Sequence, residues 1–400
     1  MIKIEEALQL IQQNLIKMGA EKIKLSEGLH RVLAEDIYAK DTLPPFDKSA
    51  MDGYAIKSED TLSVPVVLQI QGIIPAGKES ETPLEKGQAM KIMTGAPLPE
   101  GADAVIQIEE VGVEDSKLLI ERTVAKGTNI LKKGEEISCG DLALQKGKEI
   151  RPVEIGLLAS LGYDEILVYK LPQVGIISTG DELVAIDQPL EKGKIRNANE
   201  YSLLALCENL RIPCQSFGIA KDSPEALKNI IEEAAKTSDI IISSGGVSVG
   251  DFDYIEGVLE ALGAKVHFNS VAIKPGKPIT FATFASKLFF GMPGNPLSLI
   301  TTFETFVKPC IKAMCGLVFE VESTFKMIAR DYFKTKNSRC KYIYVHIQEK
   351  DGLFYALDLG TQCSNHLMTT SRANGLIIVD GETLEIKPGE SVYGRFIFRP

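Results

Sequence analysis

Three short apolar runs, each followed by a glycine-bearing loop and then by a helical pattern, constrain the fold of this chain more than any other feature. The runs are residues 174–177, 240–242 and 288–290. One intervening helix is predicted to begin at Ser223-Pro224, a cap residue followed by a proline suited to the first helical position. A strand, a loop and a helix that recur from 171 to 318 predict an α/β domain with a doubly wound parallel sheet.

The three loops have a composition that suits an anion. They read STGDE at 178–182, SSGGVSVGD at 243–251 and GMPGNP at 291–296. In an open parallel sheet, ligands bind where loops leave the carboxyl ends of the strands. Glycine, serine and threonine also let backbone N–H groups approach a phosphate closely. We therefore expect a phosphate-binding cleft at this edge of the sheet.

Two of these loops carry carboxylates, at Asp181 and Glu182 and at Asp251. A carboxylate repels a neighbouring phosphate unless a cation lies between them, and Mg²⁺ is usually held by one or two carboxylates together with phosphate oxygens. This pattern indicates a magnesium–phosphate site at Glu182 and Asp251, with Asp181 as a further candidate. The alternative is that these acids only cap the helices that follow them. Three such loops at equivalent places in one sheet favour the metal site.

A stiff basic turn follows at Lys274-Pro275-Gly276-Lys277-Pro278. Two lysines held by prolines that fix φ present ammonium groups that suit a compact oxyanion. The alternative is an ordinary solvated surface turn.

The segments on either side of the α/β domain predict three more domains. Apolar residues at 4, 8, 11 and 15 predict a helix that ends before Gly19, and residues 152–162 predict another, expected to pair with it. Alternation at 62–70 and at 341–348, with turns at Asp351-Gly352 and Asp380-Gly381, predicts strands. The expected division is a helical linker domain (1–40 and 135–170), an inserted β module (41–134), the α/β domain (171–318) and a C-terminal β domain (319–400).

Charge and cysteine content exclude several functions. The formal net charge is −10, from 44 basic and 54 acidic residues, which opposes nucleic acid or an anionic membrane as the main partner. No apolar run reaches the roughly eighteen residues of a membrane span. Early acidic residues oppose a signal peptide. Seven cysteines without a CxxC spacing and only four histidines indicate a cytoplasmic protein with reduced thiols and no soft-metal site.

Six motifs give the chain a strong resemblance to a known family. They are PPFDKSAMDGYA (44–55), MTGAPLPEGADAVI (93–106), STGDEL (178–183), SSGGVSVGDFD (243–253), VAIKPGKP (271–278) and GMPGNPLS (291–298). In this order they resemble the molybdopterin molybdenumtransferase (MoeA) family, to which the E domain of gephyrin is related. The resemblance covers nearly the whole chain.

The resemblance implies an enzyme of the last step of molybdenum cofactor synthesis. The family is a homodimeric transferase that takes adenylylated molybdopterin and molybdate and inserts molybdenum in a Mg²⁺-dependent reaction that releases AMP. Its active site lies between the α/β domain of one subunit and the β module of the other. The adenylyltransferase of the preceding step is a further expected partner.

The resemblance also implies roles for individual residues. Glu182 and Asp251 would hold magnesium or face the pyrophosphate bond, and Asp52 and Thr94 would be catalytic residues from the partner subunit. Lys274 and Lys277, with Arg339, would hold molybdate. The nucleotide or pterin phosphate and the cleft floor would be bound by Asp181, Ser244, Gly245, Gly246, Ser248, Pro293, Asn295 and Pro296.

The sequence departs from the family at four places. Lys48 replaces a frequent asparagine, Glu136 a frequent aspartate and Ser270 a frequent lysine, while Thr369-Thr370 stands where two serines are common. These departures affect which side chains would contact the bound anions.

Two alternative functions also fit part of the sequence. The adenylyltransferase of the preceding step has a domain that resembles residues 171–318, but its glycine loop usually reads TTGGTG and it lacks the β module. A gephyrin-like scaffold without catalysis is the second alternative, and the acids at Asp52, Glu182 and Asp251 oppose it.

Overall fold

The computed structural model describes residues 1–246, 254–335, 339–360 and 363–398, so Ser248 and Asp251 of the expected site lie outside the described residues. The chain forms two compact units, one of Met1–Lys22 with Leu167–Pro400 and one of Ile23–Ile166. The four expected domains divide the chain differently, since the expected linker domain (1–40 and 135–170) includes parts of both units, and their boundaries stay predictions. In the described part of the chain, no helix is long and apolar enough to cross a membrane.

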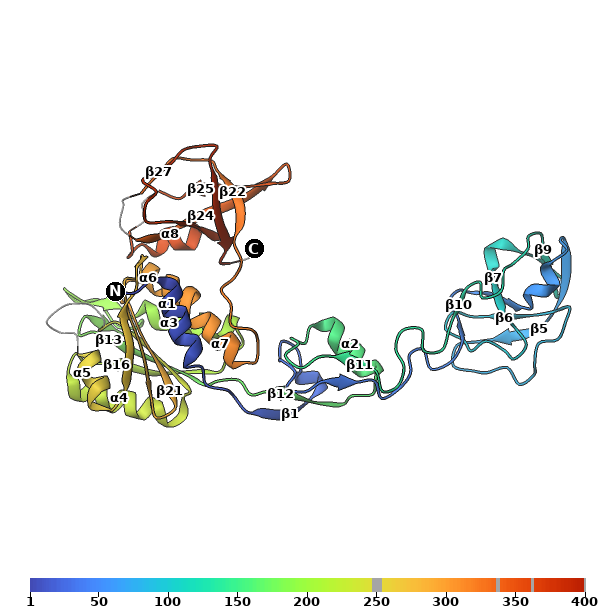
Figure 1. Ribbon diagram of the computed structural model, residues 1–400, viewed down its shortest axis with the longest axis horizontal. Coiled ribbons are helices and arrows are strands. Elements are labelled where there is room, and N and C mark those ends of the chain that lie inside the picture. The colour runs from blue at the N-terminus through green and yellow to red at the C-terminus, as the bar shows by residue number, and fades with distance from the viewer. Residues whose placement is uncertain (247–253, 336–338, 361–362, 399–400) are drawn as a thin grey trace. The chain divides into compact units, whose positions relative to one another are not determined.

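The larger unit is built around a six-stranded sheet in the order β16-β13-β17-β21-β20-β18 (Figure 1). The first four strands are parallel, as predicted, but β20 runs antiparallel to both of its neighbours. The turn between β20 and β21 has positive φ at Ala285 and Ser286, which suits a tight hairpin and reverses the chain. The strand bounds are β13 Val174–Thr179, β16 Cys214–Ala220, β17 Ile240–Ser244, β18 Lys265–Ser270, β20 Pro278–Phe284 and β21 Lys287–Met292.

Helices cover both faces of this sheet. Along β17, Ile240 and Ile242 enter one core cluster with residues of α3, α6 and α7, whereas Ile241 enters a second cluster with residues of α4 and α5. The two clusters arise because successive side chains of a strand point to opposite faces. The helices are α3 Ala198–Asn209, α4 Pro224–Thr237, α5 Ile255–Ala261, α6 Pro296–Thr302 and α7 Lys308–Met314. α4 begins where predicted, with the Ser223 side chain accepting a hydrogen bond from the Ala226 backbone N–H.

The first helix belongs to this unit. α1 (Ile4–Gln13) places Ile4, Ala7 and Ile11 in the same core cluster as Ile240. α2 (Pro152–Ser160) forms where predicted but belongs to the other unit. The expected pairing of these two helices is therefore wrong, because the apolar stripe of α1 is covered by the central domain. β1 (Ala20–Lys24) and β12 (Glu165–Tyr169) contain the points where the chain passes between the units.

A buried charge network follows α6. A π-helical turn, η4 (Phe303–Val307), joins α6 to α7 and places Glu304 in a position that is only 5% exposed. The Oε2 atom of Glu304 accepts hydrogen bonds from Lys308 Nζ at 3.0 Å and from Arg395 Nη1 at 3.1 Å. Charged groups this deep are stable only when they are paired.

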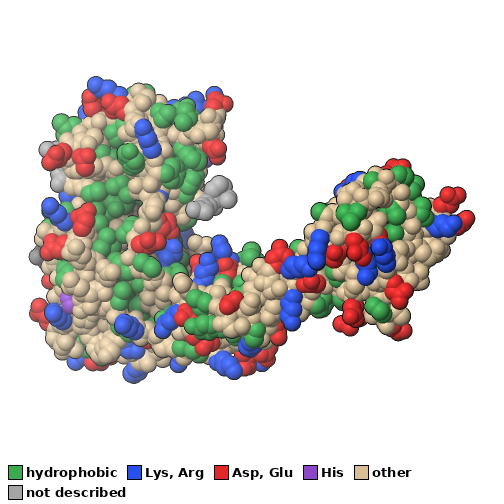
Figure 2. All heavy atoms as spheres, turned by 45° about the vertical axis from the view of Figure 1, so that its right-hand side comes forward, with side chains coloured by type: hydrophobic (Ala, Val, Ile, Leu, Met, Phe, Trp, Pro, Cys, Tyr) green, Lys and Arg blue, Asp and Glu red, His purple; other side chains and the backbone are tan. Residues whose placement is uncertain are grey.

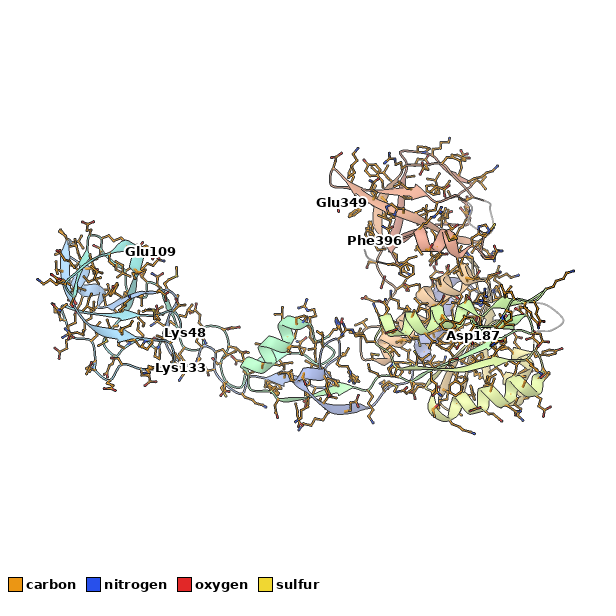
Figure 3. The ribbon with its side chains drawn as sticks, turned by 180° about the vertical axis from the view of Figure 1, so that it is seen from behind. Lys48, Glu109, Lys133, Asp187, Glu349 and Phe396 are labelled. Atoms are coloured by element: carbon orange, nitrogen blue, oxygen red, sulfur yellow. The ribbon has the colours of Figure 1, made fainter. Side chains whose placement is uncertain are left out.

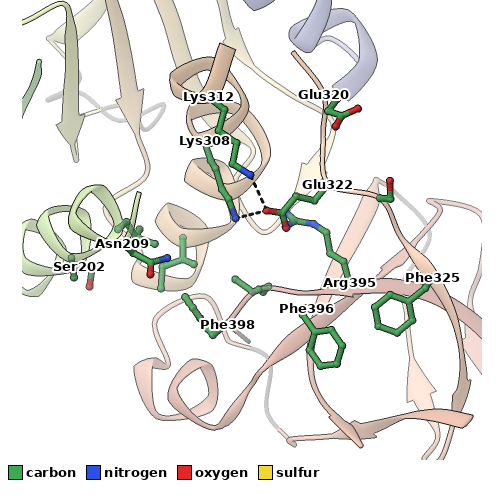
Figure 4. A pocket seen from close by; sticks show the side chains of 15 residues that line it. Ser202, Asn209, Lys308, Lys312, Glu320, Glu322, Phe325, Arg395, Phe396 and Phe398 are labelled. Carbon is green, nitrogen blue, oxygen red and sulfur yellow. Dashed lines mark hydrogen bonds and ion pairs between the residues drawn. The ribbon is translucent and has the colours of Figure 1, made fainter. Parts of the chain in front are cut away.

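Glu322 completes the network. Its carboxylate forms ion pairs with Lys308 at 2.7 Å, Arg395 at 2.9 Å and Lys312 at 3.5 Å, beside a cavity of about 990 Å³ (Figure 4). Arg395 lies on strand β28 (Ser391–Phe396) of the C-terminal domain, whereas Lys308 and Lys312 lie on α7. The network therefore ties the C-terminal domain to the helices of the central domain.

The C-terminal domain is a closed five-stranded barrel. β24 pairs with β25, β25 with β22, β22 with β28, β28 with β26, and β26 with β24 again. β19 (Ile273–Lys274) of the central domain adds to β24 from outside. The bounds are β22 Phe325–Ala329, β24 Cys340–Lys350, β25 Leu353–Asp358 and β26 Gly375–Val379, with α8 at Leu367–Arg372.

Of the two predicted turns in this domain, one is confirmed and one is wrong. Asp351 and Gly352 have positive φ and join β24 to β25 as a hairpin. Asp380 instead accepts hydrogen bonds from the backbone N–H groups of Glu382 and Thr383 through its own carboxylate. The chain then continues to β27 (Glu385–Ile386), which pairs with β23 (Phe333–Lys334) and not with β26.

The smaller unit contains a six-stranded sheet in the order β7-β4-β6-β5-β9-β8. The predicted strand at 62–70 starts only at Val66, because Leu62 and Val64 lie in exposed turns before it. The sheet strands are β4 Gly53–Ile56, β5 Val66–Ile74, β6 Gln88–Ile92, β7 Ala104–Gln107, β8 Gly112–Glu114 and β9 Lys117–Ile120. Two small ribbons pair β3 (Lys48–Ser49) with β10 (Ile130–Leu131) and β2 (Ile37–Tyr38) with β11 (Leu142–Leu144).

Both signs of charge intermingle on the visible face of the smaller unit (Figure 2). Lys132 pairs with Asp47 at 2.7 Å, and Arg122 pairs with Glu110. Lys48 lies in the ribbon of β3 and β10, Lys133 lies two residues after β10, and Glu109 lies in the turn that follows β7 (Figure 3). This face therefore presents mixed charge rather than a basic patch.

Candidate functional site

The carboxyl ends of β13, β17 and β21 meet at one cavity of about 710 Å³. All three predicted loops contribute to its wall, and α3 and α6 begin beside it. Strands that are parallel and adjacent bring their following loops together, so the sheet order alone explains this meeting. Of the expected site residues, those that line the cavity are Glu182, Ser244, Gly245, Gly246, Pro293, Asn295 and Pro296.

Gly245 lets two loops cross closely. Its backbone N–H donates to the carbonyl of Met292 at 2.9 Å, and its φ is 96°. A Cβ atom at this position would lie 2.6 Å from the carbonyl oxygen of Thr179. Only glycine combines this left-handed backbone with this approach, so the residue sets the spacing between the first two loops.

Polar side chains of α3 brace the cavity wall. The amide nitrogen of Asn199 lies 2.9 Å from Ser244 Oγ and 2.7 Å from the carbonyl oxygen of Gly294. Asn197, the residue before α3, donates from its amide to Ser178 Oγ at 2.9 Å. These contacts hold the loops after β13, β17 and β21 to one helix end.

Two acidic side chains line the wall near the first loop. Glu182 comes from the loop after β13, and Asp222 comes from the loop after β16, the neighbouring strand. Asp181 does not line the cavity; its N–H donates to the Asp222 carboxylate at 3.2 Å, and its own carboxylate accepts from the Asp222 N–H at 3.3 Å. Lys194 donates to the Asp181 carbonyl at 2.6 Å.

These acids suit a Mg²⁺ ion that keeps water and phosphate ligands better than they suit a cation held entirely by protein ligands. Within the described ranges, no group of three or more histidine, cysteine, aspartate or glutamate side chains could hold a metal. Mg²⁺ needs only one or two carboxylates, with waters and substrate phosphates as its other ligands. Glu182 and Asp222 on one wall meet that requirement, so the donor set suits Mg²⁺ bound together with a phosphate.

The basic turn lies next to this cavity. Pro278 lines the cavity, whereas Lys274 and Lys277 do not. Arg339 donates from Nη1 to the carbonyl of Ile273 at 3.1 Å, which places its guanidinium at the same strand as Lys274. The structure therefore brings Arg339 to the basic turn from a distant part of the sequence.

Lys341 adds a further positive charge that the sequence did not indicate. It is the register partner of Lys274 in the β19–β24 pair. Burial, and then the positive charge of Lys274, lower the pKa of Lys341 below its ordinary value. Two ammonium groups that repel one another in this way favour an anion between them.

Asp52 and Thr94 form a pair in the smaller unit. The Asp52 carboxylate accepts hydrogen bonds from the Thr94 backbone N–H at 2.6 Å and from the Thr94 hydroxyl at 2.8 Å. These two donors, the backbone one first, lower the pKa of Asp52, so its carboxyl group stays ionised. The motifs at 44–55 and 93–106 thus meet through one exposed acid.

Sequence reasoning missed several residues of the cavity wall. Asp222 directly precedes the predicted helix cap Ser223, and the run 214–220 before it was a strand signal that would have placed it at the sheet edge. The sequence does not indicate that Asn199 lines a cavity, because an asparagine near the start of a helix usually serves as a helix cap. Asn365 reaches the cavity from the C-terminal domain, which local sequence cannot reveal.

Three family models match the chain. A MoeA N-terminal region (domain I and II) matches residues 2–162, a probable molybdopterin binding domain matches 175–313, and a MoeA C-terminal region (domain IV) matches 326–393.

Relatives match along nearly the whole chain. A molybdopterin molybdenumtransferase of Staphylococcus aureus (strain MSSA476) is 36% identical over 98% of this chain and 94% of its own length. One of Nostoc sp. is 38% identical over 94% of this chain and 88% of its own length. The crystal structure of a molybdopterin biosynthesis moeA protein from Pyrococcus horikoshii OT3 has a TM-score of 0.85 and 31% identity, covering 99% of this chain and 100% of that one.

Proposed function

Because this chain belongs to the molybdopterin molybdenumtransferase (MoeA) family, we propose that it inserts molybdenum from molybdate into adenylylated molybdopterin, with Mg²⁺ required and AMP released. As a member of this family, the chain is a transferase of molybdenum cofactor biosynthesis. The observation that carries the finer proposal is the cavity at the carboxyl ends of β13, β17 and β21, where glycine loops and acids share one wall.

The cavity suits a nucleotide or pterin phosphate. At about 710 Å³ it has the size of a small-molecule site. Gly246 offers a backbone N–H group, neither Gly245 nor Gly246 has a side chain that would obstruct a phosphate, and Ser244 offers a hydroxyl. Pro293, Asn295 and Pro296 would form the floor, at the start of α6.

Mg²⁺ would be held by Glu182, with Asp222 and Asp251 as further ligands. Bound there, the ion would neutralise negative charge on the phosphates and polarise the bond that is cleaved. Glu182 and Asp222 would otherwise repel a phosphate, and this is why we propose that phosphate and metal bind together. Ser248 and Asp181 would complete the surroundings of the ligand.

Molybdate, the substrate that supplies the metal, would bind at the basic turn. Lys274 and Lys277 would neutralise the dianion, and Arg339 would add a planar set of donors. The turn leads directly to Pro278 in the cavity wall, so molybdate and the phosphate-bearing ligand would lie near one another. Holding two reactants together removes much of the entropic cost of their reaction.

A homodimer would complete the site. Asp52 and Thr94 would act from the partner subunit, with the ionised Asp52 carboxylate held in place by the Thr94 donors. We also propose a cytoplasmic location and contact with the adenylyltransferase of the preceding step, which would supply the adenylylated substrate.

The adenylyltransferase alternative is not favoured. An enzyme limited to the α/β domain would leave 1–170 and 319–400 without a counterpart, whereas curated relatives match across 98% of the chain. A scaffold without chemistry would not need Glu182 and Asp222 on the wall of a cavity lined by glycine loops.

The test is a complete reaction with purified protein. Adenylylated molybdopterin, molybdate and MgCl₂ should yield AMP, measured by chromatography, and a cofactor that activates a molybdenum-free molybdoenzyme. Excess chelator should stop both, and added MgCl₂ should restore them. Glu182→Gln should keep the fold but lose most turnover, whereas Glu191→Gln, on an exposed part of the following loop, should not. AMP release that persists in excess chelator would refute the metal requirement.

A further inference from the structure

One amide group joins three segments of the cavity wall. Asn199, in the first turn of α3, lies with Nδ2 2.9 Å from Ser244 Oγ and 2.7 Å from the carbonyl oxygen of Gly294. Ser244 ends β17, and Gly294 follows β21. All three residues line the same cavity.

The carbonyl of Gly294 fixes which way this amide points. A carbonyl oxygen can only accept, so the atom of Asn199 that faces it must be the NH₂ group. Both amide hydrogens are then used, one on Gly294 and one on Ser244 Oγ. The Ser244 oxygen therefore accepts a hydrogen bond from Asn199.

This assignment leaves the Ser244 hydroxyl hydrogen without an acceptor. Ser244 is only 3% exposed, and among the described residues no acceptor takes a hydrogen bond from its O–H group. A serine hydroxyl can donate one hydrogen bond in addition to those that it accepts. Because Ser244 lines the cavity, an atom of a ligand that enters the cavity can accept this hydrogen bond.

We propose that Asn199 is a positioning residue that turns the Ser244 hydroxyl into a donor aimed at an oxyanion of the bound ligand. The proposed function identifies that oxyanion as a phosphate of the nucleotide, and the inference rests on it for that identity. Asn199 itself need not touch the ligand; it acts by occupying the Ser244 lone pair and by holding the β21 loop in register.

Asn199→Asp tests this role at nearly constant shape. A carboxylate would repel the Gly294 carbonyl and would accept the Ser244 hydrogen, which reverses the polarity of the hydroxyl. The matched control is Asn209→Asp, which adds the same charge to the exposed end of the same helix. AMP binding with MgCl₂, measured by isothermal titration calorimetry at pH 8, should weaken about tenfold to a hundredfold in the first variant, as expected for a lost hydrogen bond to a charged group. The control should match the wild type.

Two further readouts separate positioning from a general structural effect. Ser244→Ala should weaken AMP binding by a similar factor, and the double variant should be hardly weaker than either single one, because both remove the same donor. AMP affinity of Asn199→Asp, relative to the control, should recover as the pH falls and the new carboxyl gains a proton that it can donate to Gly294. Melting temperatures of both single variants should stay near the wild-type value.

The inference is overturned if Asn199→Asp binds AMP as tightly as the wild type, or if its effect and that of Ser244→Ala simply multiply. Failure of the proposed function has a different signature, since the wild-type protein would then not bind AMP. In that case inorganic pyrophosphate replaces AMP in the same comparison, and a wild type that binds neither probe refutes the oxyanion itself.

Discussion

Replacing Arg395 with methionine should destabilise the larger unit strongly without touching the cavity at the carboxyl ends of the strands. Arg395 is 2% exposed and donates to Glu304 Oε2, to the Glu304 carbonyl and to Glu322 Oε2. Removing one partner of a buried ion pair costs about 3–5 kcal/mol, because the other charge stays buried. Lys308 still pairs with both acids in the variant, so we expect the lower end of that range.

The assay is urea denaturation followed by intrinsic tyrosine fluorescence, with hydrogen exchange to locate the change. Peptides from η4, α7 and β28 should exchange faster in Arg395→Met, whereas peptides from β13 and β17 should not. Arg395→Lys should fall between the variant and the wild type, because a lysine keeps the charge but not the fork of donors. Lys387→Met, which removes an exposed partner of Glu385, should change little. A loss below about 0.5 kcal/mol for Arg395→Met would refute the view that this network holds the two domains together.

Three other predictions follow from single contacts. Gly245→Ala should cost about 1–3 kcal/mol through its left-handed backbone alone, and it should also abolish AMP binding; unchanged calorimetric binding would contradict the close approach of the loops. Thr94→Val removes a donor to Asp52, so the pKa of Asp52 should rise in an NMR titration. In the wild type that pKa is lowered, so the stability from this pair is present above the unfolded-state pKa and is lost as the pH falls through the folded-state value. Burial raises the pKa of Cys207 to about 12, so iodoacetamide at pH 8 should label exposed Cys139 and spare Cys207; equal labelling would contradict that burial.

The sequence predicts the central domain well because its signals are local. An apolar run, a glycine loop and a capped helix start at Ser223 lie next to one another in the chain, and their repetition implies the shared edge where Glu182 and Ser244 meet. The antiparallel β20 was missed because the direction of a strand depends on its partner rather than on its composition.

Long-range contacts account for the other differences. The four-residue spacing of Glu304 and Lys308 is visible in the sequence, but Arg395 meets them from 91 positions away. Asp380 looks like a hairpin residue until its carboxylate satisfies the backbone N–H groups of the next turn. Local sequence indicates which backbone structure a residue favours. In both cases tertiary packing decides which contacts its side chain makes.

Because the strands of the C-terminal domain form a closed barrel, we expect this domain either to fold as a whole or not to fold. In an open sheet the loss of an edge strand shortens the sheet, but here the removal of β28 would strip hydrogen-bond partners from both β22 and β26 at once. It would also take Arg395 away from the buried acids of η4. A chain that stops before Ser391 would therefore have unpaired edges at β22 and β26 and an uncompensated buried charge, and we expect it to aggregate rather than fold with reduced stability.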